Sequence, residues 1–165
     1  MRATWARRGQ TPVLQHRFGR WTRLSAIGAL GYAPRSLRCP PRVFLAFERE
    51  SVRTPDLIRF LEHLRRQLRR PVHLIWDNLN AHRSIEMRAF LASARHWLTV
   101  ERLPAYAPEL NPVEGLWSWS TGHLLPNFCP EGLGPIRREL RRGQRLLHRH
   151  PDRIVGFLHK AGLFL

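Results

Sequence analysis

The chain has 165 residues, of which 28 are Lys or Arg and 12 are Asp or Glu, so its formal net charge is +16. This length allows one domain, residues 1–165, and a hydrophobic fraction of 43% with 6 Trp excludes a disordered basic tail. No apolar run could cross a bilayer and no secretory signal opens the chain, so we expect a cytoplasmic protein with no membrane partner.

The first part of the chain predicts strands. Residues 11–18 and 21–32 flank a glycine and predict a hairpin. One face of its second arm carries Leu24, Ala26, Gly28 and Leu30. Residues 43–47 are apolar at every position, which is typical of a strand covered on both faces.

Helices and strands alternate after residue 42. Thr54 as N-cap and Pro55 in the first turn predict a helix that Pro71 ends. Its predicted apolar stripe is Leu57, Ile58, Leu61, Leu64 and Leu68, and residues 72–76 follow as a buried strand. Ser84 caps a second predicted helix, and residues 97–103 predict another strand. A third helix contains Glu114, and two terminal helices are separated by Pro151. This alternation favours an α/β fold with parallel strands.

Two acidic residues stand out as candidates for chemistry. Asp77 follows the strand 72–76, at the carboxyl end where open α/β sheets place their ligands. A turn in the Asp-Asn pair is the structural alternative for Asp77. Glu114 follows Asn111 and Pro112, where a capping box would explain it structurally. If the two carboxylates converge, they would suit Mg²⁺, which binds one or two carboxylates, waters and phosphate oxygens.

Two longer stretches carry a family resemblance. Residues 72–82, Val-His-Leu-Ile-Trp-Asp-Asn-Leu-Asn-Ala-His, and residues 103–117, which include Asn-Pro-Val-Glu-Gly-Leu-Trp, resemble the DDE endonuclease domain of mariner-like transposases from bacterial insertion sequences. Residues 4–12 are similar to the second strand region of that family. The resemblance therefore spans nearly the whole chain.

The resemblance implies a ribonuclease H-like mixed sheet flanked by helices. It also implies DNA transposition, in which three acidic residues hold two Mg²⁺ or Mn²⁺ ions for strand cleavage and strand transfer. Asp77 and Glu114 match the second and third acids and are the implied catalytic and metal-binding residues. Asn78 and His82 are implied to contact and orient the metal ligands without binding the metal, and Asn111 to orient the helix that carries Glu114.

The chain departs from the family at its amino end. The family's first acid lies on its first strand, upstream of the segment that residues 4–12 resemble, whereas no Asp precedes Asp56 here. We therefore expect an amino-terminally truncated domain that lacks the first strand and the first metal ligand, and that is inactive alone. A homodimer or a separate amino-terminal half would be a further partner.

The charge points to a polyanion, and the penultimate helix is the best placed element to bind one. Its predicted inward stripe is Ile136, Leu140, Gly143 and Leu147. The arginines left outward are Arg137, Arg138, Arg141, Arg142, Arg145 and Arg149, and we predict DNA contact through them. A solvated helix face is the structural alternative. The second hypothesis for the whole chain is a non-catalytic, basic nucleic-acid-binding protein on a degenerate nuclease fold.

Overall fold

The computed structural model describes residues 7–10, 23–33 and 39–163 of the chain. Four strands and five α-helices occur in these ranges. In chain order they are β1 (Ser25–Gly31), β2 (Arg42–Glu48), α1 (Thr54–Leu68), β3 (Val72–Trp76), α2 (Ile85–Ala94), β4 (Leu98–Arg102), α3 (Pro112–Trp119), α4 (Leu133–Arg149) and α5 (Pro151–Lys160). No described helix combines the length and the apolar character that a membrane span requires.

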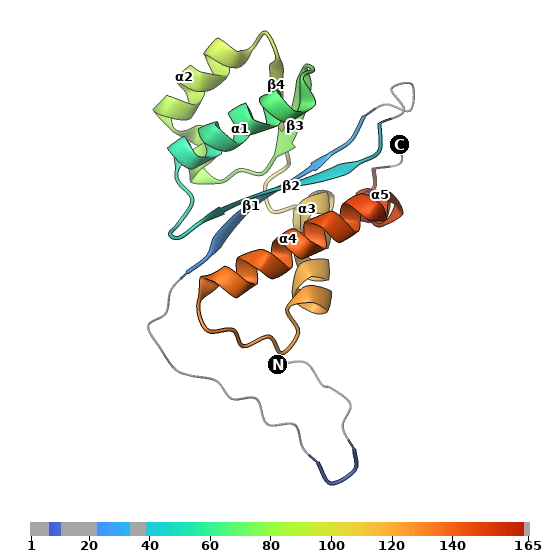
Figure 1. Cartoon of the computed structure of the whole chain (residues 1–165). Helices are drawn as coiled ribbons and strands as arrows, with labels where there is room; N and C mark the ends of the chain where they lie inside the picture. The colour runs from blue at the N-terminus through green and yellow to red at the C-terminus, as the bar shows by residue number, and fades with distance from the viewer. Residues whose placement is uncertain (1–6, 11–22, 34–38, 164–165) are drawn as a thin grey trace.

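β1 and β2 form an antiparallel ribbon between two groups of helices (Figure 1). Gly28 lies opposite Leu45 in this ribbon, so β1 pairs with the strand that follows it in the chain. The first arm of the predicted hairpin, residues 11–18, lies outside the described residues, so the hairpin stays a prediction. The described part of its second arm forms β1, which begins at Ser25.

β3 and β4 form a second, parallel pair, with Val72 opposite Leu98 and α2 as the connection between them. Among the described residues these two pairs are separate sheets of two strands each. β3 is covered on one face only, since the Trp76 side chain is buried and Ile75 is 50% exposed. The prediction of a fully buried strand at 72–76 is therefore wrong for one face.

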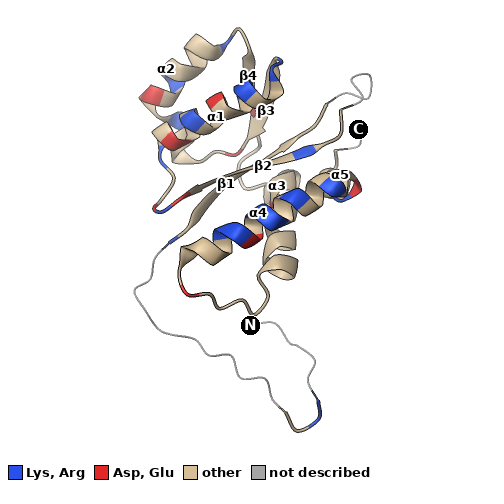
Figure 2. Ribbon diagram, in the orientation of Figure 1, with Lys and Arg blue, Asp and Glu red and all other residues tan. Residues whose placement is uncertain are grey.

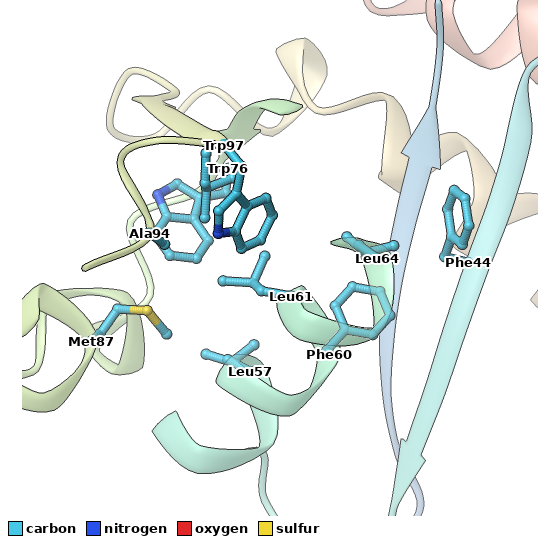
Figure 3. Packing of buried hydrophobic residues seen from close by; sticks show 10 residues of the cluster. Phe44, Leu57, Phe60, Leu61, Leu64, Trp76, Met87, Ala94 and Trp97 are labelled. Atoms are coloured by element: carbon cyan, nitrogen blue, oxygen red, sulfur yellow. The ribbon is translucent and has the colours of Figure 1, made fainter. Parts of the chain in front are cut away.

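Helix α1 connects the two sheets through one hydrophobic cluster (Figure 3). Its buried side chains contact the ribbon through Phe44 of β2 and the parallel pair through Trp76. The buried residues of this cluster are Phe44, Leu57, Phe60, Leu61, Leu64, Trp76, Met87, Ala94, Trp97 and Leu98. The apolar stripe predicted for α1 is thus confirmed, because Leu57, Leu61 and Leu64 all belong to it.

Both ends of α1 differ from the prediction. The N-cap is Arg53, and the Asp56 carboxylate accepts a hydrogen bond from the Arg53 backbone N–H at 2.8 Å. Thr54 lies inside the helix, and its hydroxyl donates to the carbonyl of Ala81 and contacts Ser84 Oγ. At the other end the helix stops at Leu68, because Arg69 adopts a left-handed conformation with φ 51°.

A second cluster lies on the other face of the ribbon, under α3, α4 and α5. Its buried residues are Val43, Leu116, Trp119, Leu124, Leu140, Leu147 and Ile154. Val43 and Phe44 are neighbours on β2 and enter opposite clusters, which confirms a strand covered on both faces. Trp119 packs inside this cluster and is 7% exposed, so it is not free to stack on a nucleobase.

We expect Gly143→Ala to destabilise the fold, although alanine is the better helix former. A Cβ at this position of α4 would collide with Leu124 and lie 3.2 Å from the ring of Trp119. Overpacking of this kind costs about 1–3 kcal/mol. Gly156→Ala in α5 is the matched control, because its Cβ would meet nothing within 4 Å and should stabilise the helix. Thermal unfolding of both variants measures the contrast, and equal melting temperatures would contradict it.

Candidate active site and arginine face

Asp77 lies directly after β3, where the chain turns into a short 3₁₀ helix, Asn80–Arg83. Its Oδ1 accepts a hydrogen bond from the backbone N–H of Leu79 at 3.2 Å and lies 3.2 Å from Nδ1 of His82. The other carboxylate oxygen, Oδ2, has no partner among the described residues, and the side chain is 46% exposed. Asp77 therefore makes the turn contact expected of an Asp-Asn pair and keeps one oxygen available.

The buried ring of His82 supports this turn from the protein interior. The ring is 6% exposed and stacks on Trp76 with ring centroids 4.0 Å apart and an interplanar angle of 4°. Nδ1 of the ring lies 3.0 Å from the carbonyl oxygen of Asp77, so an Nδ1–H donates to the backbone that carries the acid. His82 therefore contacts both the backbone and the side chain of Asp77.

Asn78 joins the carboxyl ends of the two parallel strands. Its Nδ2 donates to the carbonyl of Leu103 at 2.7 Å, and its Oδ1 accepts from Arg83 at 2.9 Å. The side chain thus holds the turn against the residue that follows β4. Arg83 is a residue that the motif did not single out, and its exposed position on the 3₁₀ helix carries no sequence signal for this role.

We expect Asn78→Ala to lower the free energy of unfolding by about 1–2 kcal/mol, because the Leu103 carbonyl would lose its partner. Asn80→Ala is a matched control two residues away, where the side chain is exposed. Urea unfolding measures both. A loss of equal size in the two variants would show that the link from Asn78 to Leu103 contributes nothing specific.

Glu114 lies in the first turn of α3. Asn111 is the N-cap, as predicted, and its Oδ1 accepts from the backbone N–H of Val113 at 3.1 Å. The Glu114 side chain is exposed and has no hydrogen bond or ion pair with any described residue. The capping-box alternative for Glu114 is therefore not observed, and its carboxylate is free.

Asp77 and Glu114 line one cavity of about 240 Å³, together with His82 and Asn111. The cavity lies between β1 and β3, with α1 on one side and α3 on the other. Four of the five residues proposed from the motifs thus meet in one place. Asn78 is the exception, because it faces β4.

Both acidic residues of the cavity have carboxylate oxygens without a partner among the described residues. Asp77 Oδ2 and the Glu114 oxygens are free, and Mg²⁺ commonly takes one or two protein carboxylates and fills its other positions with water. All 12 acidic residues of the chain lie in the described ranges, and only these two line the cavity. The described residues contain no cluster of three or more His, Cys, Asp or Glu that could hold a metal.

Helix α4 presents three stripes of side chains. The predicted inward stripe is confirmed, with Leu140, Gly143 and Leu147 buried. A second stripe follows the outer edge of β2: Arg137 and Arg141 lie over the Phe47 ring, 5.7 and 5.3 Å from its centroid. Two of the arginines predicted to contact DNA therefore also pack on the ribbon.

The same edge stripe continues through Gln144 and His148, which the sequence analysis missed. Gln144 donates to the carbonyl of Val43 at 2.8 Å, and Nε2 of His148 lies 3.0 Å from the Val43 backbone N–H. These side chains satisfy the backbone of an outer strand, which would otherwise be free to pair with another chain. A spacing of four residues on a helix was the available signal, but its target on β2 is distant in sequence.

Basic residues recur along helix α4 (Figure 2). The third stripe of α4 consists of Arg138, Arg142, Arg145 and Arg149, which recur at a spacing of three and four residues. All four are exposed, and Arg142 forms an ion pair with Glu139 at 2.8 Å. The other three make no hydrogen bond or ion pair with the described residues. The contact of these arginines with DNA stays a prediction.

A comparison with protein families identifies the domain. Residues 1–131 match the model of the DDE superfamily endonuclease. The chain belongs to the DDE endonuclease superfamily. This match confirms the family resemblance carried by residues 72–82 and 103–117. No curated protein sequence matches the chain closely enough to be counted as a relative.

A solved structure has a fold similar to that of this DDE superfamily domain. This chain superimposes on one in the crystal structure of the Mos1 strand transfer complex with a TM-score of 0.56 and 20% sequence identity. The alignment covers 99% of this chain and 50% of that chain, so the domain spans about half the length of its counterpart. The predicted ribonuclease H-like α/β fold is thereby confirmed.

Proposed function

We propose that the chain is a DNA transposase catalytic domain that binds DNA and holds a divalent cation between Asp77 and Glu114. The observation that carries this proposal is the meeting of two free carboxylates, from β3 and α3, in one cavity of a DDE superfamily fold. The net charge of +16 supports a DNA partner.

The residues around the cavity have separate tasks. A bound Mg²⁺ or Mn²⁺ ion would supply charge stabilisation at a phosphodiester oxygen and lower the pKa of a bound water. Asp77 and Glu114 would hold that ion. His82 and Leu79 contact one oxygen of Asp77, which leaves the other one available for an ion, and Asn111 fixes the start of the helix that carries Glu114.

We further propose that residues 1–165 do not cleave DNA by themselves. Two-metal phosphoryl transfer needs enough carboxylates to clamp the attacking and the leaving oxygen. The chain brings two carboxylates to the cavity, and its other ten acidic residues do not line it. A third carboxylate would have to come from outside residues 1–165.

A nicking assay tests this function. Supercoiled plasmid is incubated with the purified chain and an excess of Mn²⁺ or Mg²⁺. We expect the protein to bind the plasmid and the plasmid to remain as uncut as in a control without protein. If the chain nicks the plasmid and Asp77→Asn abolishes the nicking, the proposal that residues 1–165 are inactive alone is wrong. The assignment of Asp77 to the catalytic site would then be supported. Failure to bind plasmid at low salt would overturn the proposed function itself.

A non-catalytic nucleic-acid-binding protein is the second candidate. The outward arginines of α4 favour it, because they are independent of the acidic cavity. The two candidates differ in metal binding: a transposase domain holds Mn²⁺ through Asp77 and Glu114, whereas a purely basic binding protein shows the same DNA affinity with and without the ion.

A further inference from the structure

An open hollow, which we call the basic hollow, lies at the carboxyl end of α1, where the chain leads into β3. Its volume is about 760 Å³. Glu62 of α1, Pro71 before β3 and Trp97 before β4 form part of its wall. The rest of the wall consists of the arginines Arg65, Arg66, Arg69 and Arg70. The basic hollow therefore gathers four guanidinium groups and a single carboxylate in one concave place.

The basic hollow is remote from the acidic cavity. Pro71 precedes β3 and Asp77 follows it, so the two places lie at opposite ends of a five-residue strand, which rises about 16 Å. No described residue lines both, and no described residue of α4 lines the basic hollow. The basic hollow is thus a separate feature, which neither the acidic residues nor the arginines of α4 explain.

Arg65 is held in place on the wall of the basic hollow. Its guanidinium lies over the ring of Trp97, 5.3 Å from the centroid, and its Nη2 lies 3.4 Å from Nε2 of His96. Nδ1 of the His96 ring lies 3.1 Å from the carbonyl oxygen of Ser93, so an Nδ1–H donates there and Nε2 is left to accept from Arg65. Because these contacts already order a long side chain, an anion that binds to Arg65 need not order it again.

Arg65 makes these contacts although an acidic residue is close to it in sequence. Arg53, Arg59 and Arg142 each form an ion pair with an acid three positions earlier. Glu62 stands three positions before Arg65, but its carboxylate forms no hydrogen bond or ion pair with the described residues. The side chain of Arg65 is therefore directed to the wall of the basic hollow and not to the neighbouring acid.

The other three arginines of the basic hollow carry charge that no described residue neutralises. Arg66, Arg69 and Arg70 are exposed, and their side chains form no hydrogen bond or ion pair with the described residues. The helix dipole favours cations in the last turn of α1, which accounts for Arg65 and Arg66. Arg69 and Arg70 lie beyond the end of α1, and Arg69 has a left-handed backbone where glycine would be unstrained. A solvated helix face does not explain four arginines around one concavity.

The size and the walls of the basic hollow limit the kind of anion that fits. Guanidinium groups bind phosphate oxygens through paired hydrogen bonds, so four of them suit an anion that carries several phosphoryl groups close together. The volume of about 760 Å³ falls in the range of small-molecule sites, about 300–1,000 Å³. Trp97 is 8% exposed and lies under Arg65, so its ring offers little surface on which a nucleobase could stack.

We infer that the basic hollow binds the oligophosphate chain of a small anion through its four arginines. Trp97 and His96 are positioning residues for Arg65. An inorganic oligophosphate and a nucleotide share this chemistry and are the two sources of such a chain. The inference rests on no residue of the proposed metal site and on no arginine of α4.

Calorimetric titration of the full chain with inorganic tripolyphosphate, in the absence of divalent cations, is the first test. We expect saturable binding at one site per chain. Replacing Arg65 and Arg69 together by Gln should weaken this binding at least about tenfold, because two charge-assisted contacts are lost. Replacing Arg66 and Arg70 together by Gln should have an effect of the same size, so the result does not depend on the fold of one variant. No saturable binding up to about 1 mM tripolyphosphate would overturn the inference.

Arg138→Gln combined with Arg145→Gln on α4 is the matched control, with the same change of net charge. Both residues are exposed and neither lines the basic hollow. This variant should change the affinity for tripolyphosphate less than about twofold at moderate salt, since distant surface charges are screened. Equal weakening in the α4 variant and in the Arg65 and Arg69 variant would assign the binding to total charge and overturn the inference.

Adenosine triphosphate distinguishes the two sources of the oligophosphate chain. We expect it to bind within about threefold of tripolyphosphate, because the covered ring of Trp97 offers the base little surface. Equal affinities assign the phosphate chain itself as the ligand. Tighter binding of the nucleotide that the Arg65 and Arg69 variant weakens at least about tenfold assigns a nucleotide to the same site. Nucleotide binding that this variant leaves unchanged would overturn the inference.

Binding of double-stranded DNA separates this inference from the proposed function. If the basic hollow is a small-anion site, the Arg65 and Arg69 variant keeps the wild-type slope of log affinity against log salt for DNA. A slope shallower by about 1.8 units would mean that two phosphate contacts are lost, which would place both arginines on the DNA surface and contradict the inference. The titrations with tripolyphosphate involve neither metal nor DNA, so their failure would leave the proposed function intact.

Discussion

Asp77→Asn and Glu114→Gln should each lower the affinity of the chain for Mn²⁺ at least about 100-fold. Loss of a supporting group behind a metal ligand typically costs 10–100-fold, and loss of one of two carboxylate ligands should exceed that range. Each substitution keeps the size of the side chain. Neither residue is buried, so we expect the fold to be kept in both variants.

Glu109→Gln is the matched control for this prediction. Glu109 is exposed, lies five positions before Glu114 and does not line the cavity between β1 and β3. Glu109→Gln and Glu114→Gln change the net charge by the same amount. A difference in their Mn²⁺ affinity therefore reports the position of the carboxylate and not the total charge. Calorimetric titration with Mn²⁺ measures all three variants. If Glu109→Gln weakens binding as much as Glu114→Gln, the cation is held by diffuse charge and the proposed site is wrong.

The sequence predicted those parts of the fold whose signals are local. The apolar spacing of α1 and the N-caps Ser84 and Asn111 are confirmed. The buried face and the first turn of a helix depend on residues that are close in sequence. The N-cap of α1 shows the limit of such signals. Thr54 is a good cap residue by type, but its hydroxyl bonds to Ala81 across the fold, and Arg53 takes the cap position.

The remaining features depend on partners that are distant in the chain. The pairing of β1 with β2 is not encoded in either strand alone. The edge contacts of His148 and Gln144 on Val43 join residues more than 100 positions apart. The sequence left Asp77 open as a metal ligand or a turn residue; the fold shows the turn contact and also places Asp77 in the lining of the same cavity as Glu114.

The candidate site depends on how β3 is held. Asp77 directly follows β3, so the position of its carboxylate depends on how firmly this strand is fixed. β3 pairs with β4, and Asn78 and His82 hold its carboxyl end.

Replacing Arg138, Arg145 and Arg149 together by Gln should lower the affinity for double-stranded DNA about 10- to 100-fold at 50 mM salt. These three side chains make no hydrogen bond or ion pair with the described residues, so their loss removes charge without removing an internal contact. Each phosphate contact contributes about −0.9 to the slope of log affinity against log salt, so the slope should become shallower by about 2.7 units.

Arg66, Arg70 and Arg88, replaced by Gln, form the control with the same change of net charge. These residues lie on or just after α1 and on α2, on the other side of the ribbon from α4 (Figure 2), and all three are exposed. A general electrostatic attraction would weaken equally in both triple variants, because it depends on total charge. Phosphate contact along α4 predicts that only the Arg138, Arg145 and Arg149 variant shows the slope shallower by about 2.7 units. Fluorescence anisotropy over a series of salt concentrations measures both slopes, and equal slopes would assign these arginines of α4 to a solvated face.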